Sequence, residues 1–167
     1  MSSKFAKVAA LVGSGVLSGG SFYVSAFAIP ALLSPYRPNA KKQDGQAVLS
    51  ANTLQVQWKY VYDTGKIFFP FLGLGVSALY VYLGFNAPSD SRKLYWAAAA
   101  STIGMVPYTF AFMMGNIKKI EAEVKEDDEE NAARLRSEIV KWSRLNLART
   151  ALLFTGFLLS TWATLDV

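Results

Sequence analysis

Four long apolar stretches, separated by polar segments, set the pattern of the chain. They cover about residues 8–33, 61–85, 93–116 and 145–163. Each has about the length, roughly 20 residues, that a helix needs to cross the hydrocarbon core of a bilayer. The pattern therefore predicts an all-α fold, an integral membrane four-helix bundle, in a single domain that comprises residues 1–167.

Helical periodicity extends beyond the apolar stretches into the two long polar segments. Ahead of the second stretch, apolar residues recur every three or four positions: Ala47, Ala51, Leu54, Trp58 and Val61. Ahead of the last stretch, one helix face runs through Leu135, Ile139, Trp142, Asn146, Arg149 and Leu153. Such spacing is typical of an amphipathic helix. We therefore expect amphipathic helical extensions in the two long loops, with a solvated bend at the acidic run 126–130.

Prolines and glycines predict where the spans bend and where they pack closely. Pro30 is expected to end the first span, because proline has no amide hydrogen to donate. For the same reason Pro70 and Pro107 are expected to kink the second and third spans. Gly15 and Gly19 have the four-residue spacing that lets a neighbouring helix approach the backbone closely.

Composition favours a membrane location and excludes several kinds of site. Of the 167 residues, 52% are hydrophobic and 17% are charged, whereas soluble domains carry about a quarter charged residues. The chain has no cysteine and no histidine, which excludes disulfides, thiol or imidazole nucleophiles, and zinc, iron or haem sites that use these side chains. We therefore predict no metal site. The net charge of +5 is spread over short loops, so no nucleic-acid partner is expected.

The distribution of lysine and arginine predicts the orientation in the membrane. Basic residues are more frequent in the first and third loops than near the N-terminus and in the second loop. By the positive-inside rule, the two long loops are cytosolic and both termini lie on the opposite side. The sequence leaves the organelle open, and the endoplasmic reticulum is compatible with it.

Polar residues near the cytosolic ends of the four spans form the candidate site. In an up-down bundle these ends meet at one membrane face, and ionisable residues inside a membrane are site candidates by default. The candidates for catalysis are Asp63, Asn146 and Arg149. The candidates for substrate binding are Gln57, Trp58, Tyr108, Thr109, Asn116 and Trp142.

Each candidate also has a purely structural explanation. Arg149 lies about one turn past Leu145 and could extend its side chain to the lipid headgroups. Asn146 could bond a neighbouring helix, and Asp63 could form a surface pair with Lys66. The two tryptophans could be interface anchors. The shared depth of these residues, more than any one of them, favours a functional site.

Motifs in all four spans combine in an uncommon way. They are Trp142-x-x-x-Asn146-x-x-Arg149 in the last span, Pro107-Tyr108-Thr109 and Met114-Gly115-Asn116 in the third, Gln57-Trp58 with Gly65 in the second, and Gly15, Gly19 and Pro30 in the first. Together they resemble the anthrone oxygenase family. That family comprises small four-span membrane proteins, once grouped as a domain of unknown function. It includes fungal proteins of polyketide pathways that oxidise anthrones to anthraquinones, so the resemblance implies a monooxygenase of secondary metabolism.

The resemblance implies a flat, apolar substrate and O2 as co-substrate, with no other cofactor. The central CH2 of an anthrone is acidic because its conjugate base is a delocalised phenolate, and this anion can react with O2 without a metal. The protein would supply a base, for which Asp63 is the candidate, and an oxyanion site at Asn146 and Arg149. The aromatic walls of the slot would be Trp58, Tyr108 and Trp142.

Two other functions stay open at this point. The chain could be a non-catalytic membrane subunit that binds a soluble enzyme, or a second copy of itself, through its small-residue faces and charged third loop. In that case Asn146 and Arg149 would contact another chain or lipid, and no enclosed pocket would separate the spans. The chain could instead be a carrier for a lipophilic quinone-like ligand, which would have the pocket but perform no chemistry.

Overall fold

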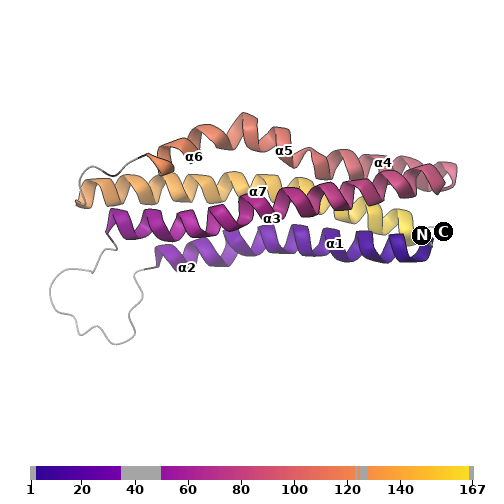
Figure 1. Ribbon diagram of the computed structural model, residues 1–167, viewed down its shortest axis with the longest axis horizontal. Coiled ribbons are helices and arrows are strands. Elements are labelled where there is room, and N and C mark those ends of the chain that lie inside the picture. Colours follow the sequence, from indigo (N-terminus) through magenta and orange to yellow (C-terminus); the bar gives the residue numbers. More distant parts are fainter. Residues whose placement is uncertain (1–2, 35–49, 123, 125–127, 166–167) are drawn as a thin grey trace.

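The computed structural model describes residues 3–34, 50–122, 124 and 128–165, and every regular element in these residues is a helix. The helices form four long rods (Figure 1). The first rod comprises α1 (Ser3–Tyr23), the π-helical turn η1 (Val24–Ala28) and α2 (Ile29–Leu33), and the second is α3 (Ala51–Asn86). The third rod comprises α4 (Ser89–Ile103), α5 (Met105–Tyr108), the π-helical turn η2 (Thr109–Met113) and α6 (Met114–Glu121), and the fourth is α7 (Glu129–Leu165).

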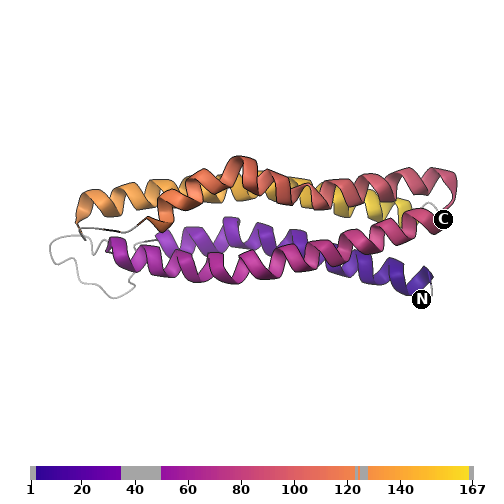
Figure 2. The ribbon, with the colours of Figure 1, turned by 45° about the horizontal axis from the view of Figure 1, so that its top comes forward.

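The rods alternate in direction along the chain, and both termini lie at the same end (Figures 1 and 2). α1 and α4 each pack against α3 and α7. Three clusters of buried side chains follow one another along the bundle. One surrounds Tyr80 near the termini, a small one surrounds Leu17, and one surrounds Trp58 near the long loops. The prediction of an all-α fold is confirmed.

Three stretches of described helix are long and apolar enough to cross a membrane: Ser3–Leu33, Ala51–Asn86 and Ser89–Glu121. Large apolar side chains cover their outer surfaces, and Phe5, Phe71 and Phe110 are each more than half exposed. Soluble proteins rarely expose apolar surface on this scale, because its contact with water is unfavourable. This surface suits lipid and is that of a membrane protein.

The fourth rod differs from the other three. α7 is 37 residues long and carries charged residues as far as Arg149. Beyond that point it is apolar, and Leu158, Trp162 and Leu165 are more than half exposed. The expected fourth span at about 145–163 stays a prediction.

The two expected extensions are continuous with the long helices. α3 runs without a break from Ala51 to Asn86, with Pro70 inside it, and α7 runs without a break from Glu129. The periodic apolar positions of both extensions share one buried cluster: Leu54, Trp58, Leu135 and Ile139. The extensions are helical because their apolar faces pack on each other. Ala47 and residues 126–127 lie outside the described part of the chain.

A π-helical turn precedes Pro30 in the first rod. Ile29 donates its amide hydrogen to the carbonyl oxygen of Val24, five residues back. The helix then continues past Pro30 for one turn, as far as Leu33. A proline cannot donate to the α-helical ladder, and a π-helical turn is one way in which a helix accommodates this loss.

The third rod changes course on either side of Pro107. The backbone turns at Gly104, α5 contains the proline, and η2 follows at once. Met114 donates to the carbonyl oxygen of Thr109, which closes η2. The rod bulges outward between α5 and α6 (Figure 1).

At Gly156, α7 lies so close to α4 that there is no room for a side chain. An added Cβ would lie 2.5 Å from the Thr102 hydroxyl oxygen and 3.1 Å from the Ala98 carbonyl oxygen, both in α4. At Gly15 an added Cβ would make only an ordinary contact at 3.8 Å, and at Gly19 it would meet nothing within 4 Å. Within the described chain, the expected close approach at the glycine pair of the first span is therefore wrong.

We expect Gly156→Ala to lower the free energy of unfolding by about 1–3 kcal/mol, the usual cost of overpacking. The backbone carbonyl of Ala98 cannot rotate away from the new Cβ, so helices must separate. The measurement is the thermal unfolding midpoint of the detergent-purified protein. Gly75→Ala is the matched control, because a Cβ there meets nothing within 4 Å. Equal midpoints for the two variants would contradict this account.

Candidate active site

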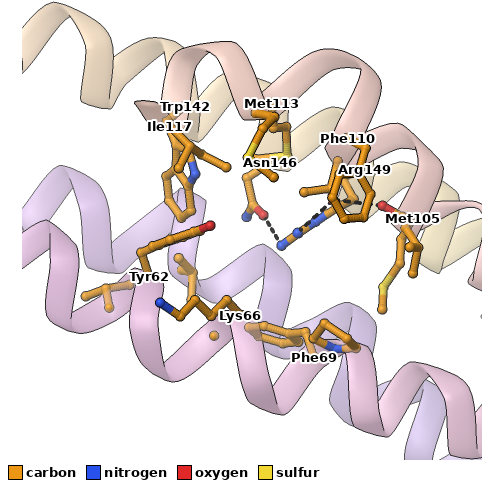
Figure 3. A pocket seen from close by; sticks show the side chains of 17 residues that line it. Tyr62, Lys66, Phe69, Met105, Phe110, Met113, Ile117, Trp142, Asn146 and Arg149 are labelled. Carbon is orange, nitrogen blue, oxygen red and sulfur yellow. Dashed lines mark hydrogen bonds between the residues drawn. The ribbon is translucent and has the colours of Figure 1, made fainter. Parts of the chain in front are cut away.

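A cavity of about 280 Å³ lies toward the loop end of the bundle (Figure 3). Its walls come from α3, from the α5, η2 and α6 segments of the third rod, and from α7, with Val24 of η1 completing it. Most of the lining is apolar or aromatic, and includes Phe69, Met105 and Met113. A few polar groups converge in this apolar setting, which is typical of a small-molecule site.

Arg149 brings a positive charge into the cavity. One terminal nitrogen of its guanidinium donates to Thr109 Oγ1 in η2 at 3.3 Å, and the other donates to Asn146 Oδ1. Its Nε is buried and has no hydrogen-bond partner among the described residues. None of the ion pairs in this part of the chain includes Arg149. The guanidinium is thus held in place by neutral groups on two sides (Figure 3).

Asn146 connects Arg149 to the first rod. Its Nδ2 donates to the Ser21 carbonyl oxygen at 3.1 Å and to Ser25 Oγ at 2.7 Å, while its Oδ1 accepts from Arg149. Asn146 is 1% exposed, so water does not reach its amide. These hydrogen bonds satisfy the buried amide group in place of water. The structural alternative for Asn146, a bond to a neighbouring helix, therefore holds together with its position at the cavity.

The π-helical turn η1 makes this connection possible. Ile29 donates to Val24 instead of Ser25, and Pro30 has no amide hydrogen. The Ser25 carbonyl oxygen is therefore available to another helix, and Ser143 of α7 donates its hydroxyl to it at 3.2 Å. A buried carbonyl needs such a partner.

Two tryptophans and a tyrosine form one aromatic cluster. Trp58 is fully buried, stacks on Tyr62 with ring centroids 5.0 Å apart, and meets Trp142 edge to face at 5.7 Å. Tyr62 and Trp142 line the cavity, and Trp58 lies behind them. Both indole nitrogens are buried without a partner in the described structure. The sequence analysis missed Tyr62, although it lies four residues after Trp58 and hence on the same helix face.

Tyr108 and Thr109 lie where α5 passes into η2. Thr109 donates its hydroxyl to the Met105 carbonyl oxygen at 2.8 Å and so presents its oxygen to Arg149. The Tyr108 hydroxyl donates to the Leu145 carbonyl oxygen at 3.2 Å. Tyr108 therefore ties the third rod to α7 and is not part of the cavity wall as described.

Asp63 lies beside the cavity and not in its wall. Its Oδ1 accepts from Lys66 Nζ at 2.6 Å, and its Oδ2 is 3.2 Å from Lys59 Nζ. Lys66 does line the cavity, with its ammonium 5.4 Å from the centroid of the Tyr62 ring. The surface ion pair is therefore present, and the role of Asp63 as a base stays a prediction.

Two other expected residues are not at the cavity. Asn116 is buried and donates to the Glu138 carbonyl oxygen at 3.1 Å and to its carboxylate at 2.7 Å. Gln57 is exposed on α3. The sequence analysis missed the apolar lining, because a residue that faces a cavity has the same pattern in the sequence as one that faces lipid.

The chemistry of the cavity suits a hydrogen-bond acceptor or an anion. In the residues that the structure describes, no three His, Cys, Asp or Glu side chains gather as a metal ion would need. The charged residues in the lining are instead the two cations, Lys66 and Arg149, and neutral polar side chains accompany them: Tyr62, Thr109, Trp142 and Asn146. A ligand that matches them is apolar over most of its surface and carries negative charge on oxygen.

Comparison with known proteins identifies one family. The family described as Anthrone oxygenase matches residues 58–159, which include every cavity-lining residue except Val24. The chain is 34% identical over 108 residues to anthrone oxygenase encC of Aspergillus fumigatus. This match covers 64% of the chain and 55%, about half, of the length of that relative. It is 27% identical over 158 residues to anthrone oxygenase nsrD of Aspergillus novofumigatus, covering 92% and 90% of the two chains. It is 28% identical over 160 residues to an anthrone oxygenase of Claviceps purpurea, covering 89% and 82%. No solved structure matches significantly.

We expect Asn146→Ala to lower the free energy of unfolding by about 1–3 kcal/mol, because buried groups on the first rod and Arg149 lose their hydrogen-bond partner. The thermal unfolding midpoint in detergent measures this. Thr155→Ala, on the exposed face of the same helix, is the control, since Thr155 donates only to the Ala151 carbonyl oxygen of its own helix. A midpoint for Asn146→Ala no lower than the control would show that Asn146 does not hold α7 to the first rod.

Proposed function

The chain belongs to the anthrone oxygenase family, and from this premise we propose that it is a membrane-bound oxygenase that oxidises an anthrone-type aromatic polyketide to an anthraquinone with O2. The observation that carries the proposal is the guanidinium of Arg149 in the wall of a largely apolar cavity, bonded to the neutral groups of Asn146 and Thr109 and with no carboxylate partner in the described chain. Such a site fits an oxyanion attached to a flat, apolar molecule. An anthrone anion has this character.

The proposed reaction balances without an external reductant. Loss of a proton from the central CH2 gives an anion whose charge is delocalised onto the carbonyl oxygen. Electrons pass from this anion to O2, a carbon–oxygen bond forms at the same carbon, and the hydroperoxide loses water to leave a second carbonyl. One oxygen atom of O2 enters the product and the other leaves as water. Because the substrate supplies all the electrons, the proposal includes O2 as co-substrate and neither a metal nor an organic cofactor.

In this proposal Arg149 stabilises the negative charge on the carbonyl oxygen. Asn146 and Thr109 hold the guanidinium before the substrate arrives, so little reorganisation is needed when the charge develops. A preorganised donor in a site that excludes water lowers a reaction barrier by about 3 kcal/mol. The cavity walls add to this because they keep the local dielectric constant low.

The aromatic cluster would hold the flat ring system of the substrate. Tyr62, Phe69 and Trp142 line the cavity and offer ring faces and edges. Trp58 supports Tyr62 and Trp142 from behind. Tyr108 and Asn116, at the contact between the third rod and α7, would fix the shape of the cavity.

Asp63 would take up the substrate proton through Lys66. Lys66 lines the cavity and already donates to the Asp63 carboxylate. In the relay that we propose, the Lys66 ammonium first passes a proton to the Asp63 carboxylate, and the neutral amine that results then accepts the proton from the substrate CH2. Asp63 is thus a positioning and accepting group behind Lys66, and it does not itself touch the substrate.

We also propose the full four-span arrangement, with the long loops on the cytosolic side and both termini on the opposite side. The rods are long enough for it, and the apolar second half of α7 would form the fourth span. The positive-inside rule supports the orientation. An anthrone substrate would place the protein in polyketide secondary metabolism.

The cavity distinguishes this proposal from the non-catalytic subunit. That alternative requires Asn146 and Arg149 to face another chain or lipid, whereas both line an internal cavity and bond to neighbouring rods. A carrier for a quinone-like ligand shares the cavity. It differs from the oxygenase in a single observable property, the absence of turnover.

We expect Arg149→Gln to reduce turnover about 10²- to 10³-fold, the usual effect of removing one oxyanion-binding donor. The measurement is O2 uptake by detergent-purified protein with emodin anthrone, corrected for spontaneous oxidation. Arg144→Gln is the matched control: it removes the same charge from an exposed position on the same helix, and it should leave turnover unchanged. Full turnover of Arg149→Gln would refute the role of the guanidinium. No acceleration by the wild type would refute the oxygenase and leave the carrier.

We expect Asp63→Asn to change the pH dependence of turnover as well as its size. The ion pair with Asp63 raises the pKa of Lys66, so the substitution lowers this pKa toward the ordinary value of a lysine. Without the carboxylate, however, Lys66 must lose its proton to water, and a lysine ammonium does so only toward pH 10. Turnover of the variant should therefore rise steeply between pH 7 and 9, about tenfold per unit, where that of the wild type changes little. Asp90→Asn is the control, because it removes the same charge from an exposed position in the first turn of α4, at the other end of the bundle. Parallel pH profiles for wild type and Asp63→Asn would exclude the relay.

A further inference from the structure

The third rod is joined to α3 at both ends and diverges from it in the middle. At the loop end, Gln55 Nε2 donates to the carbonyl oxygens of Ile120 at 2.6 Å and Ala122 at 2.8 Å. At the other end α3 packs along α4, and Phe85 meets Trp96 edge to face at 4.9 Å. Between these ends, η2 bulges away from the bundle (Figure 1). The cavity lies in this middle part, with Lys66 of α3 in one wall and Phe110 of η2 in another, and we call the space between these two segments the slit.

The cavity opens through this slit. The most exposed residues of its lining are Lys66 on α3 and Phe110 on η2, the latter 65% exposed, and they come from the two edges of the slit. The other sides are closed by hydrogen bonds. The hydrogen bond from Arg149 to Thr109 joins α7 to η2, and the one from Asn146 to the Ser21 carbonyl oxygen joins α7 to the first rod. Lys66 and Phe110 come from different walls of the cavity (Figure 3), so we place its mouth between α3 and η2.

The mouth lies where the surface of the protein changes from charged to apolar. On the loop side of it, α3 carries Lys59, Asp63 and Lys66. On the other side, the exposed residues are apolar, and Phe71 of α3 is 74% exposed. In a membrane protein, such a change marks the boundary between headgroups and hydrocarbon. The slit is therefore placed at the interface of one leaflet.

We propose that the slit between α3 and η2 is a lateral portal through which an apolar ligand passes between the lipid and the cavity. A flat polycyclic molecule partitions into the bilayer because its transfer from water is favourable, so its concentration is highest at the mouth. Phe110 forms the lipid-facing edge of the portal, and Lys66 forms its polar edge at headgroup level. The inference rests on the proposed function only for the identity of the ligand.

The chain contains no cysteine, so single-cysteine variants of the full-length protein can test the portal. Phe110→Cys places a thiol at the mouth. Two controls place it at exposed positions outside the cavity lining: Phe71→Cys on the lipid-facing surface of α3 and Glu121→Cys at the loop end. Each protein is reconstituted in phosphatidylcholine vesicles and measured before and after reaction with N-(1-pyrenyl)maleimide.

Two readouts are taken from each vesicle sample. The first is kcat/KM for emodin anthrone. The second is the rate at which emodin, an anthraquinone, quenches tryptophan fluorescence in proteins that also carry Trp96→Phe and Trp162→Phe. These substitutions remove the two exposed tryptophans, so the quenching reports entry without turnover through Trp142, which lines the cavity. We expect labelling of Phe110→Cys to lower both by about tenfold or more, as obstruction of an access step does. Labelling of the controls should leave both unchanged.

The outcomes separate the portal from the oxygenase. Inhibition of Glu121→Cys but not of Phe110→Cys would show entry from water at the loop end and would overturn the portal, as would unchanged rates for all three labelled proteins. If the unlabelled proteins, wild type included, show no turnover, the proposed function fails. The quenching rates then decide the portal alone.

Discussion

A cation inside an apolar cavity is the constraint on which the rest of the site depends. Burying an unpaired charge costs several kcal/mol, and Arg149 has hydrogen bonds only to the neutral groups of Asn146 and Thr109 among the described residues. A carboxylate in either place would stabilise the fold more. It would also cancel the positive potential that the proposed reaction needs. The choice of neutral partners is therefore what distinguishes a site for an anionic intermediate from a structural ion pair.

The two π-helical turns position these neutral partners: η2 contains Thr109, and η1 contains Ser25, which accepts a hydrogen bond from Asn146 of α7. η1 leaves the Ser25 carbonyl available to α7 and places Ser21 and Ser25 against Asn146. η2 presents Thr109 to the guanidinium from the other side and displaces the third rod outward. π-Helical turns are less favourable than α-helix and often occur at functional sites. In this protein the same π-helical turn, η2, both holds the guanidinium of Arg149 and displaces the third rod, so that the cavity lies beside the cation.

Periodicity allowed the fold class and the polar face of α7 to be predicted from the sequence. Spacings of four and three place Trp142, Asn146 and Arg149 on one face of any helix that contains them. The π-helical turns could not be predicted, because a proline is compatible with a kink, a break or an inserted residue. Nor does an apolar pattern tell a cavity from lipid: Met113 lines the cavity and is 1% exposed, whereas its neighbour Phe112 lies outside the lining and is 63% exposed. Whether Asp63 would face the cavity depended on the rotation of α3, which charge spacing alone does not fix.

The two halves of the bundle differ in how closely they can pack, and this difference controls the shape of the cavity. Near the termini, Gly156 lets α7 touch α4. Two hydrogen bonds between side chains also hold this end: Tyr80 of α3 bonds Ser160 of α7 at 2.9 Å, and Tyr95 of α4 bonds Thr164 of α7 at 3.0 Å. With one end fixed in this way, the separation of α3 and η2 arises only from the turn at Gly104 and from η2 itself. Substitutions in this short segment would change the size of the cavity and its mouth without disturbing the packed end. The fold can therefore be kept while the shape of the accepted ligand changes.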